Sequence, residues 1–109
     1  MLTLGPKVRL LGVMPQTILL LQIMDSLSDR HKLDLEVSHI IDGIHTRASI
    51  HYIGGAPDVI FKSPATTDRK LAYVAALKAS VGPDFDIILE DLNLPNEHIH
   101  GEYQPKESY

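Results

Sequence analysis

Two stretches have the spacing of amphipathic helices, and they constrain the fold of this chain more than any other feature. Residues 15–31 begin with Pro15, which suits the first turn of a helix, and apolar side chains recur on one face, at Leu20, Ile23, Met24 and Leu27. Residues 66–81 follow the same pattern, with Thr66 or Thr67 as the cap and Gly82-Pro83 as the stop. Each predicted helix therefore has one side to bury.

Shorter apolar runs predict four strands. Residues 33–41 at first alternate between apolar and polar side chains, which is typical of a half-buried strand. Strand-like runs follow at 58–61, 85–89 and 98–103. The predicted order is helix, strand, strand, helix, strand, strand. In the last strand, the two histidines are expected to point to the same side.

Composition fits one soluble globular domain that spans residues 1–109, with 44% hydrophobic and 22% charged side chains. The formal net charge of -4 argues against nucleic acid or an anionic membrane as a partner, because either requires a basic face. The chain has no cysteine, so any metal site must use His, Asp or Glu. No signal peptide is expected, and the most apolar run, 18–24, is far shorter than the roughly 20 residues that cross a bilayer.

Side chains that can bind a metal ion or take part in catalysis lie in two short segments that are far apart in the sequence. The first, SIHYIGGAPDV at 49–59, offers an imidazole at His51 and a carboxylate at Asp58, with small residues between them. The second, EHIH at 97–100, offers a carboxylate followed by another imidazole at His100. A hydrolytic zinc site uses about three nitrogen and oxygen ligands and an open position for water. We therefore predict that His51, Asp58 and His100 bind one Zn²⁺ ion.

Hydrolysis at such a site also requires a general base near the metal. Glu97 is the candidate, three residues before His100. On a regular strand Glu97 would face away from His100, so this role requires the chain to turn, which Pro95-Asn96 favours. Glu90 is the second choice as base and is otherwise interpreted as a solvated carboxylate.

Three further side chains are candidates for contacts with a ligand or with the substrate. His98 is expected to hydrogen-bond the substrate or the tetrahedral intermediate, and Ser49 is expected to orient His51. Arg47 is interpreted either as a clamp for a substrate carboxylate or as a solvated loop residue. The remaining histidines are interpreted as ordinary surface or core residues: His31, His39 and His45.

The two segments also resemble the motifs of a known family. SIHYIGGAPDV is similar to the pattern S-x-H-x-x-G-x-A-x-D, and EHIH to the ending acid-x-x-H, of the zinc D-Ala-D-Ala carboxypeptidases and L-alanyl-D-glutamate endopeptidases. The compact chain resembles their short phage-encoded members. The resemblance implies His51, Asp58 and His100 as zinc ligands, Glu97 as base and His98 as a substrate contact. It also implies an α+β fold shared with the Hedgehog signalling domain, with a small central antiparallel sheet flanked by two helices.

The resulting hypothesis is a zinc metallopeptidase that hydrolyses a peptide bond in the stem peptides of bacterial peptidoglycan. Two alternatives stay open. A phage virion protein would use the same fold as a building block among other virion proteins, with zinc structural or absent. A zinc-bearing binding module would recognise wall peptides without cutting them. The lack of an export signal fits a lysis enzyme in the host cytoplasm before lysis as well as a virion component.

Overall fold

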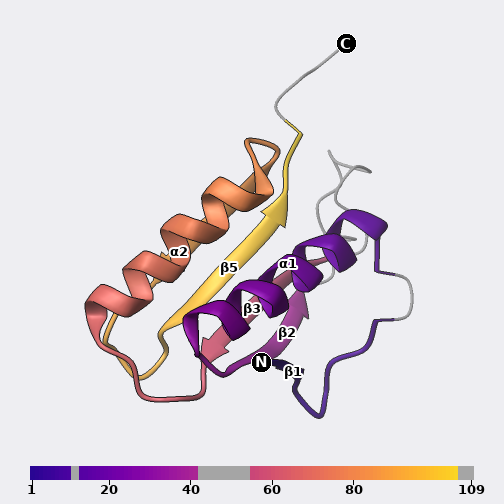
Figure 1. Ribbon diagram of the computed structural model, residues 1–109. Coiled ribbons are helices and arrows are strands. Elements are labelled where there is room, and N and C mark those ends of the chain that lie inside the picture. Colours follow the sequence, from indigo (N-terminus) through magenta and orange to yellow (C-terminus); the bar gives the residue numbers. More distant parts are fainter. Residues whose placement is uncertain (11–12, 42–54, 106–109) are drawn as a thin grey trace.

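The computed structural model describes residues 1–10, 13–41 and 55–105, and Figure 1 shows how their helices and strands are arranged. In chain order these are β1 (Leu2–Leu4), α1 (Pro15–His31), β2 (Leu35–Ile41), β3 (Ala56–Phe61), α2 (Thr67–Val81), β4 (Phe85–Glu90) and β5 (His98–Tyr103). The strands form one sheet in the order β1-β2-β3-β5-β4, and both helices lie on the same face of it (Figure 1). The predicted α+β class is confirmed.

Both predicted helices form where their end signals stand in the sequence. α1 begins at Pro15, and Lys32 follows its last residue in the left-handed conformation, with φ of 55°. α2 begins after Thr66, whose hydroxyl oxygen accepts a hydrogen bond from the N–H of Arg69 at 3.2 Å, and Gly82 ends it with φ of 83°. In the described part of the chain, no helix is both long and apolar enough to cross a membrane.

One hydrophobic core lies between the two helices and the sheet. The helices contribute buried side chains that include Leu20, Met24, Tyr73 and Leu77, and the strands contribute Leu35, Val37, Val59, Ile87 and Ile99. Alternate residues of the same strands point away from the helices, on what we call the open face. Across β2, β3, β5 and β4, the open face carries Glu36, His39, Asp58, Ile60, His98, His100, Ile88 and Glu90.

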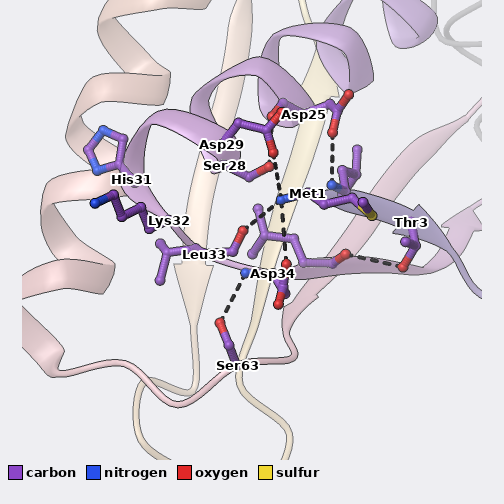
Figure 2. A network of polar contacts seen from close by, with 12 residues as sticks. Met1, Thr3, Asp25, Ser28, Asp29, His31, Lys32, Leu33, Asp34 and Ser63 are labelled. Carbon is purple, nitrogen blue, oxygen red and sulfur yellow. Dashed lines mark hydrogen bonds and ion pairs between the residues drawn. The ribbon is translucent and has the colours of Figure 1, made fainter.

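The strand β1 was not predicted, and it makes the sheet mixed rather than purely antiparallel. It runs parallel to β2 with Leu2 opposite Leu35, whereas the other three strand pairings are antiparallel. Polar contacts hold it at the edge of the sheet (Figure 2): the N–H of Leu2 donates to Asp25 at 2.8 Å, and the hydroxyl of Thr3 donates to the carbonyl of Leu35 at 3.3 Å. These partners are 23 and 32 positions away in the chain. The sequence of Leu2–Leu4 alone therefore does not indicate a strand.

Candidate functional site

The register of the sheet brings two of the three predicted zinc ligands together on the open face. β3 and β5 are antiparallel with Asp58 opposite His100, although the two residues are 42 positions apart in the chain. Nδ1 of His100 lies 2.7 Å from Oδ1 of Asp58, and the two side chains are 22% and 19% exposed. A nitrogen atom and an oxygen atom that can both bind a metal ion therefore meet at a position that water reaches.

This pair has the donor chemistry of a zinc site. Because a carboxylate only accepts hydrogen bonds, His100 donates through Nδ1–H, and in the neutral ring Nε2 carries the lone pair. Two ligands about 2.0 to 2.1 Å from one tetrahedral zinc ion lie about 3.3 Å apart, so Asp58 and His100 would have to separate by about 0.6 Å to share an ion. In a second arrangement, Asp58 orients His100 and only Nε2 of His100 faces the ion. The donor atoms of Asp58 and His100 are of a kind that zinc binds, and in the second arrangement His100 alone of the two is a ligand.

The third predicted ligand, His51, lies outside the residues that the structure describes, as do Ser49 and Arg47. Within residues 1–10, 13–41 and 55–105, no group of three or more histidine, cysteine and acidic side chains is arranged to hold a metal ion. The complete ligand set therefore stays a prediction, of which the structure places Asp58 and His100.

The described end of the first motif is anchored to α1. Gly55 has φ of 97°, in the region that favours glycine, and precedes the buried Ala56 and Pro57 of β3. The hydroxyl of Thr17, which is 1% exposed, donates to the carbonyl of Gly55 at 3.1 Å. This hydrogen bond fixes the backbone just before Asp58.

Glu97 is held by residues of α2 and of its own loop. Its Oε2 accepts hydrogen bonds from Nζ of Lys70 at 2.9 Å and from the backbone N–H of Asn93 at 2.7 Å. The Lys70 and Glu97 side chains are 13% and 11% exposed, so the ion pair is largely buried. The predicted turn before Glu97 is present, because its N–H donates to the carbonyl of Leu94 at 3.0 Å. The turn, however, presents Oε2 to the helix α2.

His98 shares the open face with His100, as the alternation of β5 predicts, because Ile99 between them is buried. Nδ1 of His98 donates to the carbonyl of Asn96 at 2.8 Å, and Nε2 lies 3.6 Å from Oε1 of Glu90. The hydrogen bond to the Asn96 carbonyl raises the pKa of His98; nearby carboxylates, including Asp58 and Glu90, raise it further, and partial burial opposes them. The protonated imidazole is thus favoured by its surroundings.

A hollow of about 310 Å³ lies beside these residues. It is lined by Ser38, His39, Asp58, Ile60, Pro95, Asn96, Glu97 and His98. Its lining therefore joins β2 and β3 to the β4–β5 loop and to the first residue of β5. Both halves of the predicted site, represented by Asp58 and His98, border this one hollow.

Ser38 and His39, the two lining residues from β2, were not predicted to lie at the site. From the sequence, His39 is interpreted as an ordinary surface or core histidine. A signal was present, because the apolar residues Val37 and Ile40 are three positions apart, and a regular strand would place them on opposite faces. Such a break in period indicates a bulge, and bulges are frequent beside functional sites.

Comparisons with models of protein families, with curated proteins and with solved structures gave no match for this chain.

Proposed function

We propose that this chain is a zinc-dependent peptidase that hydrolyses a peptide bond in the stem peptides of bacterial cell wall. The observation that carries the proposal is the meeting of Asp58 and His100 at 2.7 Å on the open face. These are the two described members of a ligand set that was predicted from two separate motifs. Asp58 also lines a hollow large enough for a small peptide fragment, which supports binding and hydrolysis at one place.

The residues that would hold the metal are Asp58, His100 and the undescribed His51. Zinc held by such a set supplies Lewis acidity, which makes both a water molecule and a peptide carbonyl more reactive. The chain itself contributes orientation: the carbonyl of Asn96 fixes the ring of His98 through Nδ1, and in the metal-free protein Asp58 does the same for His100. In its protonated form, His98 donates a hydrogen bond from Nε2 to an oxygen of the substrate.

Two carboxylates are available for proton transfer. Glu97 lines the hollow, and Lys70 and Asn93 already donate to its Oε2. As general base, Glu97 would therefore take the proton at Oε1 and later return it to the leaving amine. Glu90 is half exposed and lies next to His98 on the open face, so it is the alternative base.

Zinc analysis and turnover of soluble stem peptides test the proposal. The wild type is expected to bind one zinc ion and to cleave the peptide, and Glu97→Gln is expected to retain zinc and to lose at least about 100-fold in kcat. Glu90→Gln is the matched variant: a larger loss in Glu90→Gln than in Glu97→Gln would reassign the base. A wild-type protein that binds no zinc and cleaves no stem peptide would contradict the proposal.

One observation favours a second candidate function without catalysis. The buried contact of Glu97 with Lys70 is the kind of contact that fixes a loop, and a loop-fixing Glu97 suits a virion building block or a zinc-bearing module that binds wall peptides. This candidate predicts the protein in purified phage particles, or peptide binding that persists in Glu97→Gln with no cleavage by either form. Particle analysis together with a cell-wall zymogram separates it from the peptidase.

A further inference from the structure

A β-bulge in β2 decides which side chains face the candidate site. Val37 is opposite Val59, but the next pairing joins His39, rather than Ser38, to Asp58. Ser38 is therefore the extra residue of the bulged strand. In a strand of the same sequence without the bulge, the alternation that buries Val37 would also turn His39 toward the helices.

The consequences of the bulge are visible on both faces of the sheet. Beyond the bulge, Ile40 is half-buried and packs against the hydrophobic core, whereas His39 is exposed on the open face. His39 lines the same hollow as Asp58 and His98. Across the sheet, Asp58 has His39 on one side and His100 on the other. The bulge therefore does two things: it turns Ile40 toward the core, and it places the polar side chain of His39 at the hollow.

The hydrogen bonds of Ser38 favour one tautomer of His39. The hydroxyl of Ser38 donates its only proton to the carbonyl of Asp58 at 3.1 Å. Its oxygen, 3.2 Å from Nδ1 of His39, can therefore only accept, so Nδ1 of His39 carries a proton. In the neutral ring, Nε2 is then the atom with the lone pair.

We propose that His39 is a substrate-binding residue of the candidate site, which accepts a hydrogen bond from a peptide N–H through Nε2. This inference rests on the proposed peptidase function and adds a contact from β2 to the motif residues of β3 and β5. Its position opposite Asp58 places the bound peptide across β2 and β3. His39 holds the substrate and leaves the zinc ligands unchanged.

The test uses two substitutions that divide the functions of the imidazole. The amide of Asn in His39→Asn can replace Nδ1 in the contact with Ser38, but nothing replaces Nε2, whereas Gln in His39→Gln carries its amide near the position of Nε2. Glu36→Gln is the matched control, because Glu36 lies on the same strand and face but does not line the hollow. KM and kcat are measured for a soluble stem pentapeptide ending in D-Ala-D-Ala, together with zinc content.

We expect His39→Asn to raise KM about tenfold, the effect of one lost hydrogen bond, with kcat and zinc content unchanged. His39→Gln should retain most of the affinity, and Glu36→Gln all of it. The chemical shifts of the His39 ring on addition of the pentapeptide give a second readout, which does not depend on cleavage.

The possible failures are distinguishable. If the wild type cleaves or binds the pentapeptide and His39→Asn has the same affinity for it, only the role of His39 is overturned. A loss of zinc in His39→Asn also overturns it, because His39 would then act on the metal. A wild type that neither binds nor cleaves the pentapeptide overturns the inference together with the proposed function.

Discussion

The two faces of the sheet use alternate residues of the same strands for different purposes. On the helix-covered face, Val37, Val59 and Ile99 have no exposed surface and form part of the core. On the open face, the adjacent residues Asp58 and His100 hydrogen-bond to each other beside a hollow. The free energy of folding is therefore expected to come from one face and the chemistry from the other. Substitutions on the two faces should have separable effects.

The largest expected effect distinguishes the two faces with one type of substitution. Ile99 in β5 is 0% exposed on the helix-covered face, and Ile88 in β4 is 51% exposed on the open face. Ile99→Ala should lower the free energy of unfolding by about 3 kcal/mol, because it leaves a cavity in the core. Ile88→Ala should lower it by less than about 1 kcal/mol. Denaturant unfolding measures both; equal losses would mean that another part of the protein covers the open face.

The next prediction tests whether Glu97 stabilises the fold through its ion pair with Lys70. Lys70→Met leaves the largely buried carboxylate of Glu97 without its ammonium partner and should cost about 2 kcal/mol of unfolding free energy. Glu97→Gln should cost a similar amount, and the double variant less than the sum of the two, because each single change removes the same interaction. Lys78→Met, on an exposed position of the same helix, is the control. Strict additivity in this double-mutant cycle would show that the ion pair contributes no stability.

A smaller effect is expected where the helix-covered side supports the first motif. Thr17→Val keeps the shape of the side chain but removes the donor to the buried carbonyl of Gly55, so it should cost about 1.5 kcal/mol. The same substitution at the exposed Thr3, which donates to Leu35, should cost less than about 0.5 kcal/mol. Thermal or denaturant unfolding gives both values. If the two variants were equally stable, Thr17 would not anchor the segment before Asp58.

The helices and most strands were predictable because their signals are local. Pro15, Thr66 and Gly82 mark helix ends by their own conformational preferences, and these ends are found in the structure. β1 had no such signal, because its stability depends on contacts with α1 and β2 that are distant in sequence.

The residues of the candidate site that belong to the two motifs were predictable. The contacts and orientations that depend on tertiary packing were not. The adjacency of Asp58 and His100 follows from a zinc hypothesis that requires them to meet, and the register of β3 and β5 supplies it. The partner of Glu97 was missed. Lys70 has the helical spacing of the buried Tyr73, Val74 and Leu77, which indicates that it lies toward the protein, but the sequence does not indicate which carboxylate it meets. The orientation of His39 depends on a bulge that only the pairing of β2 with β3 reveals.

The smallest expected effect concerns the charge of His98 on the open face of the metal-free protein. Its hydrogen bond to Asn96 and the carboxylates nearby raise its pKa above the ordinary value of about 6.5. His98 therefore stabilises the fold most fully below about pH 6.5, and this contribution is lost as the pH rises through its folded-state pKa. Ring-proton titration by NMR measures the shift. Glu90→Gln should reduce it and Glu36→Gln should not, whereas a pKa at or below about 6.5 in the wild type would separate His98 from the acidic groups of the open face.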